Sequence, residues 1–255
     1  ELELSQPMTS ALEVIAHRGY SAAAPENTLE ALERALEAGA DAVEFDLHIA
    51  ACGTPVLFHD ETLERTTDGQ GLLRAQPLES LRALDAGGWF SSEWNGARIP
   101  TLAEAMDRLK GRVGRVYAEI KAWHEPAHLD RMLDIVQTAD LAYDTVFISM
   151  DWRALEHIAA RDDSVGIGYI VESRERWSDA LRRASPQERA IIDVDHRLLL
   201  TEPELVAEAA AHGIETAVWT VDEPDEAEAL ARAGVTRFTT NQVERLLIWR
   251  EGRPL

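Results

Sequence analysis

Two carboxylates stand one residue apart inside an apolar run, in the segment AVEFDLHI at residues 42–49. In a β-strand alternate side chains share a face, so Glu44 and Asp46 would point the same way while their apolar neighbours point the other way. Two like charges in one small volume cost free energy, because each carboxylate disfavours ionisation of the other and burial disfavours both. A bound cation would remove this conflict.

The same spacing recurs in the segment AEIK at residues 118–121, which places Glu119 and Lys121 on one face of another predicted strand. Carboxylate oxygens are the ligands that Mg²⁺ and Ca²⁺ prefer. Any single buried acid could instead form an ion pair with an arginine or lysine. Three acids together with two histidines, an arginine and a lysine favour a metal site. We therefore predict one divalent metal ion, Mg²⁺ or Ca²⁺, bound by Glu44, Asp46 and Glu119.

Two histidines are the candidates for proton transfer. His17 ends the first apolar run and is followed by Arg18. A Gly-Thr turn would fold residues 55–60 back as a hairpin that brings His59 close to the acids. Since no Cys/His cluster predicts a zinc site, the two imidazoles are expected to act as general acid and general base. Arg18 offers a planar fork for phosphate oxygens and Lys121 offers a point charge, so the set predicts phosphoryl chemistry.

The elements that must position these residues alternate regularly. Short β-rich segments, each followed by an amphipathic helical pattern, occur at residues 12–17, 42–47, 113–121, 145–150, 165–171, 190–195, 216–221 and 235–240. Eight such units in one chain of this length are typical of a parallel (β/α)8 TIM barrel, whose active site lies at the C-terminal ends of the strands. A doubly wound open sheet is the alternative, but no G-x-G-x-x-G opens the first unit.

One stretch interrupts this alternation. Residues 60–100 are loop-like and contain Trp89, Phe90 and Trp94. Long insertions in such barrels occur mostly on the active-site face, so we predict an insertion that caps the pocket. The alternative is that its three aromatic residues form a satellite core under the loop.

Composition restricts the remaining possibilities. The 255 residues, of which 45% are hydrophobic, suit a single catalytic domain over residues 1–255, with residues 1–10 as a tail and Met8 as an alternative start. The net charge of −21 disfavours nucleic acid and anionic membranes as partners. No run of about 20 apolar residues and no signal-peptide pattern occur, so we expect no stable membrane insertion and a cytoplasmic location.

Five separated motifs resemble, in the same order, those of the glycerophosphodiester phosphodiesterases, whose barrel is shared with phosphatidylinositol-type phospholipases C. They are HRGYSAAAPENT (17–28), VEFDL (43–47), VLFHDETLERTTDG (56–69), AEIK (118–121) and AVWTVD (217–222). The resemblance runs from residue 17 to residue 241. The chain departs from the family pattern at two places. The family often has Thr-x-Asp-Gly where this chain has residues 51–53, and often has Asp where this chain has Asn241.

The resemblance implies metal-dependent hydrolysis of a small glycerophosphodiester to sn-glycerol 3-phosphate and an alcohol, with the glycerol 2-hydroxyl as the first nucleophile. The head-group alcohol and the oligomeric state are left open. The implied roles are acid and base for His17 and His59, metal ligands for Glu44, Asp46 and Glu119, phosphate contacts for Arg18 and Lys121, and a wall of the glycerol pocket for Trp219.

Two rival functions use the same residues. A lysophospholipase D would accept an acyl tail along the aromatic residues of the insertion, and a barrel that only binds phosphodiesters would have no need of an acid/base pair. Among the other polar residues, Asp193 and Asp195 repeat the alternating acid pattern and either line the pocket floor or form structural hydrogen bonds. His48 is expected to be solvated or to pack in the hairpin, and Glu26 either to order the loop after the first strand or to reach the metal shell.

Overall fold

The computed structural model describes residues 12–252, and every structural statement below refers to that part of the chain. The predicted tail at residues 1–10, with the alternative start at Met8, lies outside the described residues.

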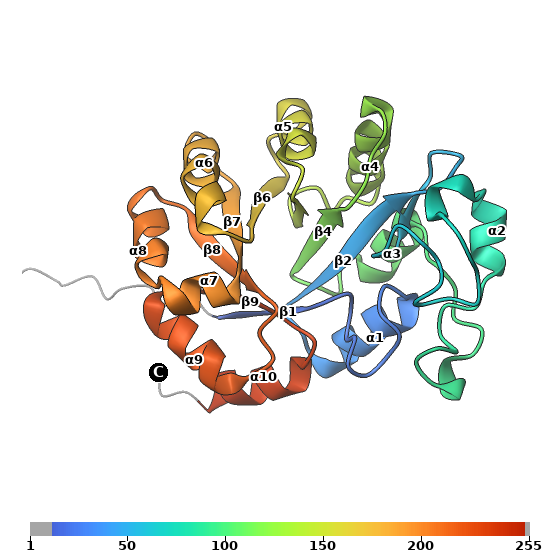
Figure 1. Cartoon of the computed structure of the whole chain (residues 1–255), viewed down its shortest axis with the longest axis horizontal. Coiled ribbons are helices and arrows are strands. Elements are labelled where there is room, and N and C mark those ends of the chain that lie inside the picture. Colours follow the sequence, from blue (N-terminus) through green and yellow to red (C-terminus); the bar gives the residue numbers. More distant parts are fainter. Residues whose placement is uncertain (1–11, 253–255) are drawn as a thin grey trace, which may run out of the picture.

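Eight parallel strands form a closed barrel surrounded by helices (Figure 1). The first strand pairs in parallel with both its sequence neighbour and the last strand, and this double pairing closes the sheet. The predicted TIM barrel is therefore confirmed. Its strands are β1 (Glu13–Ala16), β2 (Ala42–Ile49), β4 (Arg115–Ile120), β5 (Thr145–Ser149), β6 (Gly166–Val171), β7 (Ala190–Asp195), β8 (Glu215–Trp219) and β9 (Arg237–Thr240).

The helices cover the outside of the barrel, because their apolar stripes pack against the outward-facing side chains of the strands. Two helices rather than one follow β7. The helices are α1 (Leu29–Ala38), α2 (Leu78–Ala83), α3 (Leu102–Leu109), α4 (Pro126–Thr138), α5 (Trp152–Arg161), α6 (Arg174–Ala184), α7 (His196–Thr201), α8 (Glu204–Ala211), α9 (Pro224–Ala233) and α10 (Val243–Glu251), with short 3₁₀ turns η1 (Leu73–Ala75) and η2 (Ser92–Trp94).

The predicted hairpin after β2 is also confirmed. The short strand β3 (Pro55–Leu57) runs antiparallel to β2 and pairs Leu57 with Leu47. Directly after it, the Phe58 N–H donates to the Asp46 carbonyl. The chain therefore returns to the C-terminal end of β2, where the acids lie.

The interior of the barrel changes from apolar to polar along the strands. Its apolar layer includes Ile15, Tyr117, Ile191 and Ala217. Two residues farther along the same four strands, the inward-facing side chains line a pocket, because alternate strand residues share a face. These four pocket residues are His17, Glu119, Asp193 and Trp219.

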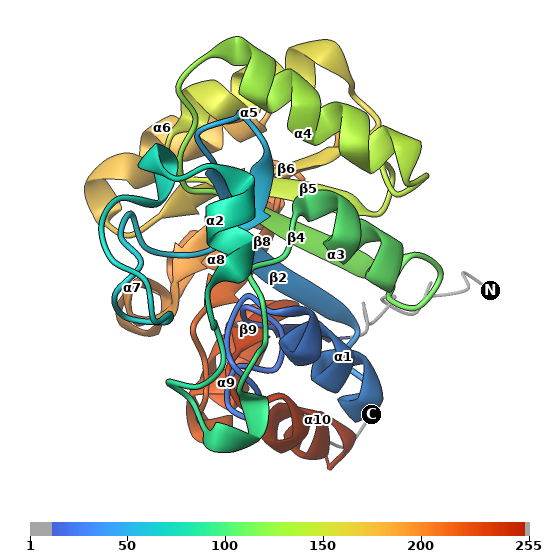
Figure 2. The ribbon, with the colours of Figure 1, turned by 90° about the vertical axis from the view of Figure 1, so that its right-hand side faces the viewer.

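The insertion at residues 60–100 packs as a unit of its own. It lies at the outer edge of the molecule in Figure 1, and its helix α2 faces the viewer in Figure 2. Its buried residues form a satellite core, but the three aromatic residues are not among them: Trp89 is exposed and stacks edge-on against Phe90, and Arg34 lies over the Trp94 ring. The core consists of Leu63, Leu73, Leu81, Ala86 and Ile99 with Ala50, Val56 and Phe58 of the barrel.

Candidate active site

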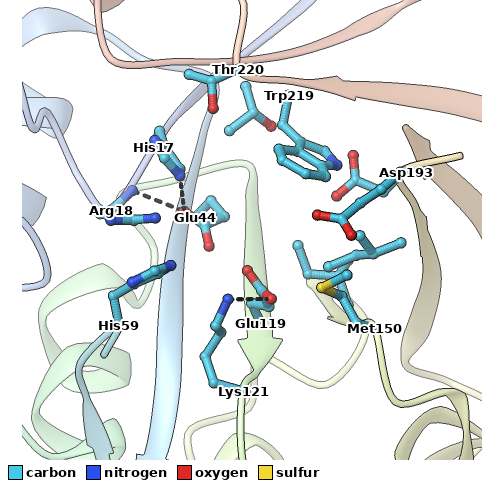
Figure 3. A pocket seen from close by; sticks show the side chains of 14 residues that line it. His17, Arg18, Glu44, His59, Glu119, Lys121, Met150, Asp193, Trp219 and Thr220 are labelled. Atoms are coloured by element: carbon cyan, nitrogen blue, oxygen red, sulfur yellow. Dashed lines mark hydrogen bonds and ion pairs between the residues drawn. The ribbon is translucent and has the colours of Figure 1, made fainter. Parts of the chain in front are cut away.

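Three carboxylates meet at the C-terminal ends of two neighbouring strands. Glu44 and Asp46 lie on β2, and the register of the sheet sets Glu119 of β4 directly beside Asp46. One oxygen from each carboxylate lies within 4.8 Å of the others. The cluster was predicted from the spacing of the acids, and Figure 3 shows two of its members, Glu44 and Glu119, facing the same space.

The electrostatics of this cluster are unfavourable without a cation. Burial, with the charges of Asp46 and Glu119, raises the pKa of Glu44 well above its usual value. Burial and the Asp46 charge raise the pKa of Glu119 to about 7. Burial acts in the same direction on Asp46, but the positive charges of Arg18, His59 and Lys121 outweigh it, so the pKa of Asp46 is lowered.

The donor set fits a hard divalent cation. All three side chains offer carboxylate oxygens, which Mg²⁺ and Ca²⁺ prefer. Asp46 is fully buried, and its Oδ1 has no hydrogen-bond partner in the described residues, whereas Oδ2 accepts a hydrogen bond of 2.8 Å from Asn27 Nδ2. A buried oxygen left without a partner is costly unless something else binds it.

The loop after β1 holds the cluster in place. Arg18 and Asn27 have φ angles of 55° and 58°, and Gly19 has 75°. A Cβ on Gly19 would lie 2.5 Å from the backbone of Ala31, so only glycine fits there. This turn lets the Arg18 N–H donate to Glu44 Oε2 over 2.9 Å. Asn27 holds Asp46 through two hydrogen bonds: its Nδ2 donates to Asp46 Oδ2 over 2.8 Å, and its Oδ1 accepts from the Asp46 N–H over 3.0 Å.

His17 is oriented by a chain of hydrogen bonds from the last strand. Its Nδ1 lies 2.7 Å from Asn241 Oδ1, and Asn241 Nδ2 donates to Asp222 Oδ2 over 2.9 Å. Since the amide nitrogen faces the carboxylate, the amide oxygen accepts from His17, which places the proton on Nδ1. Nε2 then faces Glu44 Oε2 at 4.0 Å. Burial and the neighbouring Arg18 charge lower the pKa of His17 to about 4.

His59 is oriented in a different way. Its Nδ1 donates to Asp60 Oδ1 over 2.6 Å, because a carboxylate can only accept. Arg65 Nε holds Asp60 from the far side over 2.6 Å, and Arg65 also binds Glu26. His48 supports the backbone of the same segment through Nε2, 2.9 Å from the His59 carbonyl oxygen.

The two predicted phosphate contacts border the same space. Arg18 pairs with Glu26 over 2.8 Å, and its Nε lies 3.1 Å from Asp46 Oδ2 without the alignment needed for a hydrogen bond. Lys121 Nζ donates to Glu119 Oε1 over 2.9 Å. Both cations therefore lie beside the acids that the metal site would use.

These groups line one pocket of about 190 Å³. It brings together seven of the eight predicted site residues, and the eighth, Asp46, lies buried next to them. None of residues 61–100, all of which the structure describes, lines it, but Arg65 of the insertion binds Asp60 and Glu26 beside it; that the insertion caps the pocket stays a prediction. Its polar wall contains His17, Arg18, Glu44, His59, Glu119, Lys121, Glu172, Asp193, Thr220 and Thr239, and its other residues are Ile148, Met150, Ile170 and Trp219.

Sequence reasoning did not assign roles to the residues that orient the histidines. Asp60 follows His59 directly, and Asp222 ends the segment AVWTVD, so both stand in segments that were singled out. Arg65 also stands in such a segment, VLFHDETLERTTDG, and Asn241 departs from the family pattern, but nothing local indicates their contacts with Glu26 and His17, which are 39 and 224 residues away.

A family model for the glycerophosphoryl diester phosphodiesterase family matches residues 17–245. The chain belongs to this family. It is therefore a glycerophosphodiester phosphodiesterase, a phosphoric diester hydrolase. A glycerophosphodiester phosphodiesterase of Caldanaerobacter subterraneus subsp. tengcongensis is 32% identical over 238 residues, which cover 92% of this chain and 96% of the relative.

Solved structures agree with the family and the fold. A phosphodiesterase of Oleispira antarctica, solved in complex with the product sn-glycerol-3-phosphate, is 29% identical, with a TM-score of 0.86 and coverage of 94% of this chain and 97% of that one. A glycerophosphodiester phosphodiesterase of Agrobacterium tumefaciens is 26% identical, with a TM-score of 0.80 and coverage of 93% and 99%. Within residues 12–252, no helix combines the length and the apolar character needed to cross a membrane.

Proposed function

We propose that this phosphodiesterase cleaves glycerophosphodiesters to sn-glycerol 3-phosphate and an alcohol, with a divalent cation in the acid cluster and His17 and His59 as base and acid. The observation that carries the proposal is the convergence of three carboxylates, within 4.8 Å of one another, with two histidines and two cations around one pocket. The product bound to the Oleispira antarctica protein, sn-glycerol-3-phosphate, is the product that we propose for this chain.

The cation would be held by Glu44, Asp46 and Glu119. When bound, it would lower the pKa of a substrate hydroxyl and offset the negative charge that develops on the phosphate. The unpartnered Oδ1 of Asp46 and the raised pKa values of its two neighbours support this assignment.

His17 is suited to remove a proton. Its Nδ1–H is tied to the neutral amide of Asn241, and its Nε2 is left free toward the pocket as an acceptor. A low pKa keeps the imidazole uncharged, which a general base requires before the reaction. We propose that His17 removes the proton of the glycerol 2-hydroxyl. Attack of this oxygen on phosphorus would release the alcohol and give a cyclic phosphate that water then opens.

His59 is suited to donate a proton. Its Nδ1–H points at the carboxylate of Asp60 rather than at an amide, and a carboxylate in that position stabilises an imidazolium. Its Nε2 would then protonate the departing alcohol oxygen. The different partners of the two histidines are the reason for assigning them different roles.

The remaining predicted contacts complete the site. Arg18 and Lys121 border the pocket and would hold the non-bridging phosphate oxygens, and Trp219 would form the wall against the glycerol. Neither rival function gains support. The aromatic residues of the insertion do not reach the pocket, and a barrel that only binds has no use for two differently oriented histidines.

The test is a hydrolysis assay with two readouts: glycerol 3-phosphate release for the deacylated diesters, and choline release for the lysophospholipid, because its cleavage leaves the acyl chain on the glycerol phosphate. The protein is treated with EDTA and then supplied with Mg²⁺ or Ca²⁺, and glycerophosphocholine, glycerophosphoethanolamine and a lysophosphatidylcholine are compared. We expect release from the two deacylated diesters only when a divalent cation is present. Full activity in the presence of EDTA would contradict the metal assignment, and preferential cleavage of the lysophospholipid would favour the lysophospholipase D.

A further inference from the structure

The proposed mechanism uses only one side of the pocket. The acids of β2 lie on that side together with both histidines. In the closed barrel β7 stands directly opposite β2, because three strands separate them in each direction around the sheet. Asp193 projects from β7 into the pocket, and Figure 3 shows it beside Trp219, away from His17 and His59. No step proposed so far involves this carboxyl group.

Asp193 is buried without compensation. Only 3% of its surface is exposed, and Oδ1 has no hydrogen-bond partner in the described part of the chain. Three isoleucines lie near it: Ile170 is its neighbour on β6, Ile148 lines the same pocket, and Ile191 lies one inward-facing position below it on the strand. Burying an unpaired carboxyl group costs free energy, so a residue of this kind calls for a ligand or another explanation.

A second unpartnered atom lies on the same side. Trp219 Nε1 is buried and has no acceptor within residues 12–252. The indole N–H can only donate, whereas a carboxyl group can accept and, when protonated, also donate. A hydroxyl group matches this pair, because one oxygen can accept from the indole and exchange a hydrogen bond with the carboxyl.

The charge state of Asp193 favours an uncharged ligand. Burial and the charge of Glu119 raise the pKa of Asp193 to about 8, so the carboxyl is mostly protonated near neutral pH. A neutral carboxyl group attracts neither the ammonium of a head group nor a metal ion strongly. Asp193 also lies outside the group of acids whose oxygens approach within 4.8 Å of one another.

We infer that Asp193 and the Trp219 indole N–H bind the terminal hydroxyl of the glycerol moiety and so select substrates in which that hydroxyl is free. The inference rests on the proposed function, which directs the phosphate and the 2-hydroxyl toward the acid cluster. The terminal carbon is then the part of the glycerol that extends across the pocket. It ends on the side of Asp193.

This assignment explains how a deacylated substrate is distinguished from a lysophospholipid. An acylated terminal oxygen has no proton to donate, and its chain would have to enter a pocket of about 190 Å³ whose floor is closed by isoleucines. The chain would keep the terminal oxygen from reaching Asp193 and Trp219, which would then stay unpaired. Sites built to bond a hydroxyl reject analogues that lack it much more strongly than apolar sites reject a missing methylene.

The test compares two diesters that differ by one oxygen. Glycerophosphocholine carries the terminal hydroxyl, and the phosphocholine diester of propane-1,2-diol lacks it but keeps the 2-hydroxyl. For the wild type we expect kcat/KM to favour the first by on the order of 10²-fold. Asp193→Ala should lower kcat/KM for glycerophosphocholine by roughly 10-fold or more and leave the propanediol diester within about 3-fold, because only the first substrate loses a bond.

Two further variants serve as controls. Asp193→Asn keeps a hydrogen-bonding group of the same shape and should retain most of the preference. Asp195→Asn changes an acid two residues along the same strand that does not line the pocket; it caps α7, accepting from the Arg197 N–H over 2.9 Å, and lies 3.7 Å from His196 Nδ1. Since asparagine caps helices as well as aspartate, this variant should behave as the wild type with both substrates.

A binding measurement separates this inference from the proposed function. Calorimetry with sn-glycerol 3-phosphate and propane-1,2-diol phosphate, in the presence of Mg²⁺ or Ca²⁺, should show that Asp193→Ala weakens only the first by roughly 10-fold. Equal losses for both ligands would make Asp193 a structural residue, and no loss for either would remove it from the site. If neither diester is hydrolysed while the selective binding persists, the proposed reaction fails and the assignment of Asp193 stands.

Discussion

Removal of the cation should destabilise the protein by an amount that can be estimated. Glu44, Asp46 and Glu119 repel one another in a buried site, and a ligand that binds only the folded state stabilises it by mass action. At a free metal concentration of 100 times Kd the gain is about 2.7 kcal/mol. For a chain of 255 residues, about 2–4 °C per kcal/mol converts this to a rise in Tm of about 5–11 °C.

The assay is a thermal melt of EDTA-treated protein with and without Mg²⁺ or Ca²⁺. Glu119→Gln removes one ligand of the cluster and should lose most of the metal-induced rise in Tm. Glu172→Gln is the matched control, because Glu172 is an exposed acid at the rim of the same pocket outside the cluster. Its rise should equal that of the wild type. No rise with either metal, or the same rise in both variants, would refute the metal site.

The sign of the pH dependence provides an independent check of the same site. The pKa of Glu119 in the folded, metal-free protein is about 7, above its ordinary value of 4.5. Between pH 4.5 and about 7 the folded state therefore holds a proton that the unfolded state releases, so this group makes folding less favourable as pH rises through that range. The metal-free wild type should lose stability relative to Glu119→Gln between these pH values. A bound metal requires the deprotonated ligand, so the metal-induced rise in Tm should grow with pH.

Three further outcomes are expected. His17→Ala and His59→Ala should each lower turnover of the natural diester by about 10²- to 10⁴-fold. With a 4-nitrophenyl diester only the loss in His59→Ala should become smaller, because a good leaving group needs no general acid; equal losses with the natural and the 4-nitrophenyl leaving group would contradict the assignment. Asn241→Ala should lower kcat by roughly 10-fold or more with little change in KM, since it frees Nδ1 of the base, and an unchanged kcat would count against a positioning role. A 2-deoxyglycerol diester should bind but react far more slowly; a rate close to that of the natural diester would rule out the cyclic route.

The barrel could be predicted from the sequence because its strands carry the strongest local signal. Each of the eight predicted segments overlaps an observed parallel strand, and the last strand was predicted at 235–240 and found at Arg237–Thr240. Buried parallel strands are almost continuously apolar, so an acid within one is conspicuous. The same contrast that identifies β2 as a strand therefore identifies Glu44 and Asp46 as unusual.

The residues that orient the histidines could not be found in this way. Asn241 and His17 are 224 residues apart in the sequence, and their contact depends on the pairing of β1 with β9. Arg65 and Glu26 are 39 residues apart and meet only because the loop after β1 approaches the start of the insertion. Polar side chains in loops have no periodicity, so nothing local predicts such partners.

Asp193 and Asp195 show where alternation alone stops being informative. The two acids are two residues apart on β7, so alternation predicts that both face the pocket floor. The strand ends at Asp195, where the backbone turns into α7 and the side chain caps the helix instead of pointing inward. Asp193, one inward position earlier, stays in the barrel with an unpartnered oxygen. A protein that keeps such a group on the side opposite the acid cluster accepts a loss of stability there, as binding sites commonly do, and the free hydroxyl of a deacylated glycerol is the ligand that would recover it.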